Sequence, residues 1–542
     1  GSFTGSIDNV SVKEYTSADM DVTRATAATR VDENGLVNYA EVLGGEEVDN
    51  GDFSNGTTGW SEENSSTISV GTHQGRTNVA DINIGDTSSG SRIQQLFDYV
   101  NGKTYQISVD VYLVSGSFRS DSRDAFVSDD FVSTSTTGSW ITLTSTFTAI
   151  QTGQDVVWLR SLSEVSQFYV DSISIKEVQR DNVPRIDYTG GGCPHILAEP
   201  MRTNLITYSE DFSQSYWTKT GITLESGNTS PDGTVNAYKL VEDTSTGQHR
   251  TFSGIQTVSS GVTVTSSIYV KSAERSWFLL EESQSGAGYY FNNGVVGSNV
   301  GSPLNYKIDT LLNGWFRYSI TTTAAATTTR LMFRISESDG VISYTGDGTS
   351  GLYAWGGQIE QGSYATSYIP TSGSTVTRNQ DIFTRDGIGS LIGQTEGTFF
   401  IELSKPVLNP DSYYLISLNN AAADTNANSV TIGFDSSSAD FYIRLESGGS
   451  TIYVDNNRAS LANTFYKIAV AYKSGQSLIY IDGSPITPNS GSLSGAFSFS
   501  ETLDNLSFDY DGNNSLAFFG KVKQLQVFKT ALTDSELIAL TT

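Results

Sequence analysis

Side chains able to bind a sugar are the most informative chemistry in this sequence. Sugars offer C–H faces that stack on aromatic rings and hydroxyls that hydrogen bond to amides, carboxylates and guanidinium groups. Trp158 and Trp277 are open between a sugar platform and core packing. Tyr289, Tyr290 and Asn292 belong to a Gly-bounded stretch that we expect to form an exposed aromatic loop, a candidate sugar site. The other tryptophans are expected in the core: Trp60, Trp140, Trp217, Trp315 and Trp355.

Polar residues near the C-terminal end offer a second candidate sugar site. Asp435 and Asn456 are expected in loops, where they could line a hydrogen-bonding or calcium-assisted site. Solvated loop side chains are the alternative explanation of the same pattern.

Catalytic chemistry has little support in the residue pattern. Glycosidases hold two carboxylates about 5–10 Å apart across the scissile bond. Lectin-like sandwich hydrolases usually carry them in a Glu-x-Asp-x-x-Glu strand, which is absent, and Glu281 with Glu282, or Glu396 with Glu402, has the wrong spacing. Three scattered histidines and one cysteine leave little for a metal or nucleophile site. We expect no catalytic residues, although a depolymerase site assembled from distant carboxylates stays open.

Composition excludes several classes of partner. The 542 residues include 32 Lys and Arg against 59 Asp and Glu, a formal net charge of −27, which disfavours binding to nucleic-acid phosphates. Aromatic residues make up 11% of the chain, too many for a disordered acidic segment. No run approaches the roughly 20 apolar residues that cross a bilayer, so membrane insertion is not expected.

Short alternating segments broken by Gly, Asn or Asp predict an all-β fold of tandem antiparallel sandwiches. In residues 105–111 the odd positions are apolar and could face a core. Ile479 and Ile481 end a strand at Asp482-Gly483, a pair suited to a tight hairpin. Thr533 precedes Glu536 by three residues and predicts a capping box on one short C-terminal helix.

Internal repeats divide the chain. The phrase at residues 8–14 recurs at 171–177, where it closes a unit that opens near residue 50; the first copy has no opening partner, so the chain is expected to be a piece of something longer. We expect the following organisation: 1–15 as the last strand of a preceding β-domain, 16–45 as a connector, 46–180 as an inserted jelly roll, 181–202 as a Gly-rich connector, 203–370 as a second sandwich, 371–390 as a linker and 391–542 as a last sandwich. Segments 20–42 and 182–203 should then lie side by side.

Two phrases carry a family resemblance. Residues 202–212 (RTNLITYSEDF) and 355–371 (WGGQIE, then TSYIPT) resemble the opening and closing of carbohydrate-binding-like sandwiches in bacteriophage tail-fibre, head-fibre and receptor-binding proteins. Residues 46–180 resemble jelly-roll carbohydrate-binding modules. Residues 391–542, with YIDG at 480–483 and VFKTALT at 527–533, resemble the concanavalin A-like or laminin-G-like lectin fold.

The resemblance to jelly-roll modules implies a structural Ca²⁺ where the first and last strands meet. Asp52 and Asp171 match that place, and Asp211 and Glu360 hold comparable positions in the next unit. Hard cations take several oxygen ligands, which acidic loops supply. A carboxylate that caps a turn or is merely solvated is the alternative.

Together these observations favour a non-catalytic virion appendage protein that faces outward and recognises host-surface glycans. Other virion proteins would be its partners, and a homotrimer is implied by the resemblance alone. A purely structural spacer or capsid decoration is the alternative, and a polysaccharide depolymerase tailspike is the third.

Overall fold

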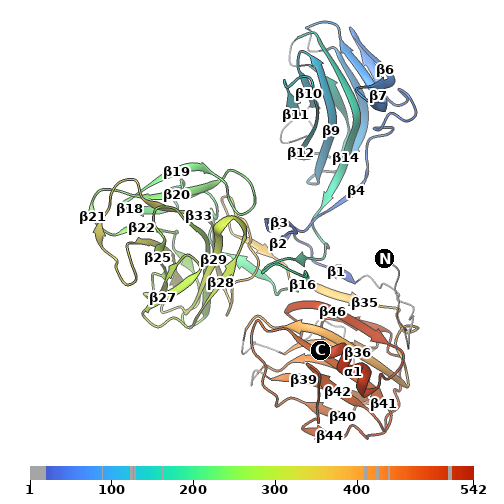
Figure 1. Ribbon diagram of the computed structural model, residues 1–542, viewed down its shortest axis with the longest axis vertical. Helices are drawn as coiled ribbons and strands as arrows, with labels where there is room; N and C mark the ends of the chain where they lie inside the picture. The colour runs from blue at the N-terminus through green and yellow to red at the C-terminus, as the bar shows by residue number, and fades with distance from the viewer. Residues whose placement is uncertain are drawn as a thin grey trace, which may run out of the picture. The chain divides into compact units, whose positions relative to one another are not determined.

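The computed structural model describes residues 20–87, 90–122, 126, 130–161, 164–407, 413–421, 427–436, 440–510 and 516–542. The strand expected over 1–15 lies outside the described residues. The predicted all-β class is confirmed: sheets dominate, and the described residues contain one α-helix (Figure 1). No helix among them has the length and apolarity to cross a membrane. The chain divides into one compact unit at Glu41–Val183 and another made of the residues on either side of it.

The unit at Glu41–Val183, here called the first sandwich, has two antiparallel sheets. The first sheet runs β11 (Asp130–Thr134), β10 (Phe118–Asp121), β13 (Gly153–Arg160), β8 (Arg92–Tyr99) and β5 (Ser61–Glu63). The second runs β12 (Trp140–Thr148), β9 (Thr104–Ser115), β14 (Ser166–Gln179), β7 (Arg76–Ile84) and β6 (Ser66–His73), with β4 (Val42–Glu46) paired to β14.

Alternation along the strands builds the core of this sandwich. Tyr105, Ile107, Val109 and Val111 of β9 are all buried in the core, as the alternation of residues 105–111 predicts. Because neighbouring side chains of a strand point to opposite faces, the residues between them lie on the outer surface.

The second sandwich has two sheets of six strands each. One runs β18 (Thr218–Thr220), β22 (His249–Phe252), β31 (Leu331–Ser336), β25 (Trp277–Glu282), β26 (Ala287–Asn292) and β27 (Val295–Val300). The other runs β19 (Ile222–Asn228), β20 (Ala237–Glu242), β33 (Gly351–Gln361), β24 (Thr263–Ser272), β29 (Trp315–Thr323) and β28 (Asn305–Thr310). A 3-10 turn, η1 (Leu312–Gly314), and the two-stranded pairs β21 (Thr246–Gly247) with β32 (Tyr344–Thr345) and β23 (Gln256–Thr257) with β30 (Thr328–Thr329) complete it.

The third sandwich recruits strands from distant segments of the chain. Its eight-stranded sheet runs β1 (Asp21–Thr23), β35 (Ile382–Arg385), β45 (Asn505–Ser507), β37 (Tyr414–Asn419), β38 (Ser429–Phe434), β39 (Phe441–Ser447), β40 (Ser450–Asp455) and β44 (Ser490–Gly491). Its seven-stranded sheet runs β15 (Ile186–Asp187), β16 (His195–Ala198), β46 (Gly520–Phe528), β36 (Glu396–Ser404), β41 (Tyr466–Lys473), β42 (Leu478–Ile481) and β43 (Ser484–Pro485). The segments expected to be connectors and a linker therefore supply β1, β15, β16 and β35, because an edge strand can satisfy its backbone groups by pairing with whichever segment lies beside it.

Local signals at the end of the chain are confirmed. Asp482 and Gly483 both have positive φ values of 45° and 74° between β42 and β43, as a tight hairpin requires. The helix α1 (Asp534–Thr541) begins with the capping box of Thr533 and Glu536. Leu537 of α1 packs with Phe400 and Tyr480 on the outer face of the seven-stranded sheet.

The chain segments that flank the first sandwich in sequence are hydrogen bonded to each other. The backbone N–H of Tyr188 donates to the carbonyl of Val31 at 3.0 Å, and the Val31 N–H donates to the Asp187 carboxylate at 3.0 Å. Two further short pairs accompany them: β2 (Thr29–Val31) with β3 (Val37–Tyr39), and β17 (Arg202–Asn204) with β34 (Val376–Arg378). This side-by-side placement is what insertion of a module into a connector requires.

A buried ion network joins these segments to the end of the second sandwich. Arg185 contacts Glu199 at 2.6 Å and also pairs with Asp381. Arg24 contacts Asp381, and Arg378 contacts Glu199, each at 2.6 Å. All five side chains are buried. Although burial opposes ionisation, the guanidinium groups of Arg378 and Arg185 lower the pKa of Glu199 to about 2.

We predict that Glu199→Gln destabilises the unit that contains this network by about 3–5 kcal/mol, because it leaves the buried Arg378 without its carboxylate and Arg185 with Asp381 alone. The folded pKa of Glu199 lies below its ordinary value of 4.5, so its contribution is complete above about pH 4.5 and is lost as the pH falls towards 2. Calorimetric unfolding across this pH range measures both effects. An unchanged transition in the variant would contradict the stabilising role of the network.

Candidate functional site

Trp158 lies on the outer face of the first sandwich, near the end of β13. Its neighbours Val157 and Leu159 are fully buried in the core. Strand alternation therefore turns Trp158 outward, where it is half-buried. Its strand neighbours in register are Gln94 on β8 and Asp121 on β10. The indole Nε1 donates to Gln94 Oε1 at 3.1 Å, which holds the ring in one orientation.

Charged and amide groups surround this ring. We call Trp158 and its neighbours Arg92, Gln94, Asp121 and Arg160 the Trp158 face. The guanidinium carbons of Arg92 and Arg160 lie 4.5 and 4.9 Å from the ring centroid, within cation–π range. Arg160 Nε donates to the fully buried Asp121 at 2.9 Å. Burial raises the pKa of Asp121 above its ordinary value, although the adjacent guanidinium groups oppose this shift. An aromatic surface ringed by fixed donors and acceptors is suited to a sugar, since it meets both C–H faces and hydroxyls.

A row of aromatic side chains on the opposite sheet of the same sandwich was not predicted from the sequence. Trp140 was expected in the core, but it is half-buried on the outer face of β12. Its indole packs edge-on against Tyr112 at 5.7 Å, Tyr112 stacks on Tyr169 at 5.9 Å, and Tyr169 stacks on His73 at 4.4 Å. Arg76 lies over Trp140 at 4.2 Å. The expectation was wrong because alternation alone does not say which of two faces a tryptophan takes. The other four core tryptophans are buried as predicted: Trp60, Trp217, Trp315 and Trp355.

The expected aromatic loop of the second sandwich is a strand. Tyr289, Tyr290 and Asn292 all lie on β26, and the turn that follows, at Asn293 and Gly294, has positive φ. Tyr290 is buried, whereas Tyr289 and Asn292 are half-buried. The segment is a strand and not a loop because β26 pairs with β25 along its whole length, and with β27 on its other side. Trp277 is half-buried on β25 and lies opposite Asn292. The structure thus brings Trp277, Tyr290 and Asn292 onto one sheet.

The two candidate residues of the third sandwich have separate surroundings. Asp435 follows β38 and is buried, with its backbone N–H bonded to the carbonyl of Asp440 at 2.9 Å. Asn456 follows β40, is half-buried and exchanges hydrogen bonds with Asn489 at 3.0 and 2.9 Å. Asp435 is therefore not an exposed loop ligand.

Each carboxylate considered for calcium has a protein partner. Asp52 accepts hydrogen bonds from the N–H and hydroxyl of Ser54 at 3.1 and 2.9 Å. Asp171 pairs with Arg76 at 2.7 Å. Within the described ranges, no group of three or more His, Cys, Asp or Glu side chains is arranged to hold a metal. Calcium therefore stays a prediction.

The corresponding pair in the second sandwich is also engaged. Asp211 accepts from Ser213, Gln214 and Tyr238, and these bonds lower its pKa to about 2 against the opposing effect of burial. Glu360 is buried and accepts from the backbone N–H of Thr366 at 3.0 Å. Both carboxylates hold local chain geometry in the way that a turn-capping residue does.

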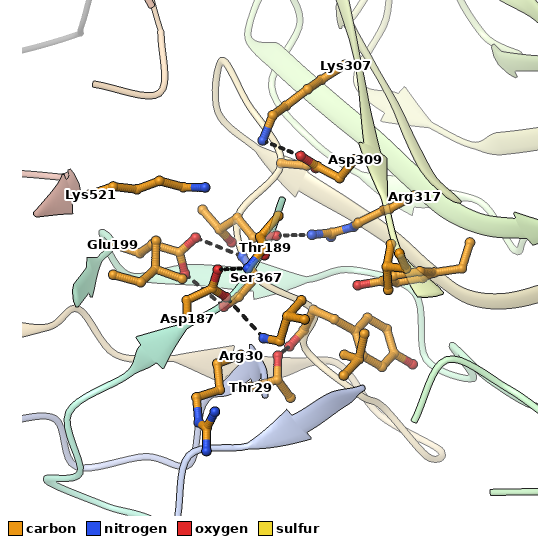
Figure 2. A pocket seen from close by; sticks show the side chains of 18 residues that line it. Thr29, Arg30, Asp187, Thr189, Glu199, Lys307, Asp309, Arg317, Ser367 and Lys521 are labelled. Atoms are coloured by element: carbon orange, nitrogen blue, oxygen red, sulfur yellow. Dashed lines mark hydrogen bonds and ion pairs between the residues drawn. The ribbon is translucent and has the colours of Figure 1, made fainter. Parts of the chain in front are cut away.

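A small cavity lies beside the buried ion network (Figure 2). Asp187 extends to the cavity from β15 and pairs with His195 Nε2 at 3.1 Å. Burial alone would raise the pKa of Asp187, but the contact with His195 lowers it below its usual range. Lys307 pairs with Asp309 at 2.9 Å, and Lys521 extends towards the cavity from β46. The volume of about 70 Å³ holds a few waters, whereas ligand pockets span roughly 300–1,000 Å³. The cavity is therefore too small for a sugar ring.

Two family models match parts of the chain. Residues 45–160 match the model of a carbohydrate-binding domain, and residues 407–538 match that of the concanavalin A-like lectin/glucanases superfamily. The first match contains the Trp158 face, and the second contains most of the third sandwich. No curated protein matches the chain at a significant level.

Several solved structures resemble the chain weakly. The tandem CBM22-1–CBM22-2 domain of Paenibacillus barcinonensis Xyn10C is 15% identical over 60% of this chain and 98% of its own, with a TM-score of 0.25. The CBM40 domain of Ruminococcus gnavus IT-sialidase is 17% identical over 28% and 84%, with a TM-score of 0.24. Domains LG4-5 of mouse laminin α1 are 14% identical over 57% and 92%, with a TM-score of 0.19. With TM-scores this low, these likenesses say nothing about the function of this chain.

We predict that Asp121→Asn lowers the stability of the first sandwich by about 2 kcal/mol, because Arg119 and Arg160 lose a charged acceptor that is fully buried. The matched control is Asp98→Asn, which removes an exposed carboxylate from the same sheet and should change stability by less than about 0.5 kcal/mol. Denaturant unfolding of the whole chain, followed by tryptophan fluorescence, distinguishes the two. Equal effects would argue against a structural role for the Arg–Asp contacts.

Proposed function

We propose that this chain, which carries a carbohydrate-binding domain and a concanavalin A-like domain, recognises glycans through the Trp158 face. One observation carries the proposal: a half-buried indole, held by Gln94, stands among guanidinium and amide groups on an outer sheet face of the carbohydrate-binding domain. The exposed part of the ring supplies a stacking surface. Arg92 and Gln94 supply groups that bond sugar hydroxyls without a large loss of side-chain entropy, since their positions are already constrained.

We further propose that the chain is not an enzyme. The carboxylates with the best chance of acting in pairs have other partners. Glu282 accepts from the backbone N–H groups of Gln284 and Ser285 at 3.0 and 2.7 Å. Glu396 contacts Lys473 at 2.9 Å, and Glu402 lies 3.6 Å from Lys523. A carboxylate engaged in this way is not poised to protonate a leaving group.

Placement on a phage virion, as a fibre or receptor-binding appendage, is the finer form of this proposal. Its support is the pair of phrases at residues 202–212 and 355–371, together with a series of sandwiches and an acidic charge that suits an outward-facing surface. A spacer or decoration role would need the same fold but no glycan binding, so the binding experiment separates the two.

We predict that Trp158→Ala reduces retention on glycans about fivefold or more, because a stacked sugar loses about 1–3 kcal/mol when its aromatic partner is removed. Trp140→Ala is the matched control: it removes a half-buried tryptophan, also covered by an arginine, from the opposite sheet of the same sandwich. Glycan-array binding followed by calorimetry with the retained glycan measures both variants.

Retention unchanged in Trp158→Ala but lost in Trp140→Ala would move the site to the other sheet. Absence of retention by the unmodified chain on every host glycan would favour the spacer role. Release of reducing ends from a retained polysaccharide would overturn the proposal that the chain is not an enzyme.

A further inference from the structure

The outer face of one sheet of the second sandwich carries a group of arginines. On β31, Leu331, Phe333 and Ile335 are buried in the core. Met332 and Arg334, which alternate with them, therefore belong to the outer face. In register, Arg334 lies opposite Arg250 of β22 on one side and Leu279 of β25 on the other.

Arg330 lies close to Arg250, and the two share one aromatic ring. The guanidinium carbons of Arg250 and Arg330 lie 4.7 and 4.2 Å from the ring centroid of Phe252. We call the three arginines, with Phe252 and Glu281, the arginine face. It occupies the outer surface of β22, β31 and β25.

The guanidinium groups of the arginine face are poorly compensated. Among the described residues, the side chain of Arg250 forms no hydrogen bond or ion pair, and the buried Nε atoms of Arg250 and Arg334 have no hydrogen-bond partner. Arg334, only 6% exposed, has Glu281 at 3.8 Å and donates to the weak acceptor Met332 Sδ at 3.3 Å. Arg330 donates to the Ser253 carbonyl at 2.6 Å. One carboxylate thus faces three cations.

The ion pairing of this face is looser than that of the buried network. The chain carries 59 acidic against 32 basic residues, and Arg24, Arg185 and Arg378 each contact a carboxylate at 2.6 Å, whereas the carboxylate nearest to Arg334 lies 3.8 Å away. Arg334 is buried with a distant carboxylate and an unpartnered Nε, and a buried polar group that stays unsatisfied calls for an explanation. Burial and mutual repulsion with Arg250 lower the pKa values of Arg330 and Arg334. An anion would relieve both effects.

The residues beside the arginines point to a sugar as the carrier of that anion. Tyr290 lies next to Leu279 across β25 and β26, and Trp277 and Asn292 pair at the end of the same two strands. Trp277 and Asn292 are half-buried and supply aromatic surface and an amide, whereas Tyr290 is buried. A guanidinium binds a carboxylate through two parallel hydrogen bonds, a geometry that a planar carboxylate fits well.

We propose that the arginine face binds a carboxylate-bearing sugar residue, with Arg250 and Arg334 contacting the carboxylate. This site differs from the Trp158 face in sandwich and in ligand class. The net charge of −27 opposes the approach of a highly charged polyanion, so a glycan with isolated acidic residues fits better than a nucleic acid or a densely sulfated chain.

The test compares acidic sugars with neutral forms of the same sugars. Oligogalacturonate and its carboxyl-reduced form make one pair, and 3′-sialyllactose and lactose make the other, so that a uronic acid and a nonulosonic acid are distinguished. We expect calorimetric binding of at least one acidic member that is at least tenfold tighter than binding of its neutral partner. The proposal would be overturned if both members of each pair bound equally, or if neither acidic member bound. It would also be overturned if equimolar sodium sulfate displaced the bound acidic sugar as effectively as the free sugar does.

Removing a positive charge and removing a negative charge from the arginine face should change the affinity for acidic sugars in opposite directions. Arg250→Gln and Arg334→Gln should weaken acidic-sugar binding about tenfold or more, as expected for loss of a charged hydrogen bond. Glu281→Gln should strengthen it severalfold, because it removes the carboxylate that competes for Arg334. Arg385→Gln, a partly exposed arginine on β35, is the control and should have no effect.

Two further measurements separate this proposal from others. Thermal unfolding checks that each variant is folded; Arg250 is only half-buried, so its substitution should be tolerated even if that of Arg334 is not. Trp158→Ala should leave acidic-sugar binding unchanged. Loss of acidic-sugar binding in Trp158→Ala, with retention in Arg250→Gln, would assign that binding to the Trp158 face and contradict the present inference.

Discussion

The ion network of Arg24, Arg185, Arg378, Glu199 and Asp381 constrains the whole unit that contains it. These residues come from three stretches of the chain far apart in sequence, yet each needs the others because an unpaired buried charge is strongly unfavourable. The pairing holds the connectors together. Once they are adjacent, β1, β15, β16 and β35 complete the sheets of the third sandwich. Segments that look like linkers in the sequence thereby become part of a core.

Antiparallel sandwiches separate stability from recognition by means of the two faces of each sheet. The inner faces are apolar and closely packed, whereas the outer faces carry aromatic and charged side chains that stability alone does not require. The Trp158 face and the arginine face both follow this rule. They differ in how closely a carboxylate contacts the guanidinium groups, because Asp121 contacts both Arg160 and Arg119 directly, whereas Glu281 lies 3.8 Å from Arg334. That difference is the physical basis for assigning them different ligands.

The acidic charge of the chain is not spread evenly over its structure. Carboxylates cap turns at Asp52 and Asp211, or pair with cations in the buried network. Local groups of arginines can therefore remain attractive to single anions while the protein as a whole repels polyanions. Such a surface favours discrimination between glycans by the position of a charge, and not by total charge.

The sequence by itself determined the all-β class, the core alternation of residues 105–111, the hairpin at Asp482-Gly483 and the capping box at Thr533, because each depends on residues close in the chain. It also indicated Trp158 and Trp277 as surface candidates. Strand order and register were beyond its reach, so it misplaced Trp140 and treated Tyr289 and Tyr290 as a loop. Only the tertiary structure decided that Arg250 lies beside Arg334 and that Arg185 meets Asp381. These pairs are separated by tens to hundreds of residues, and their contact depends on which strands become neighbours, which no local pattern encodes.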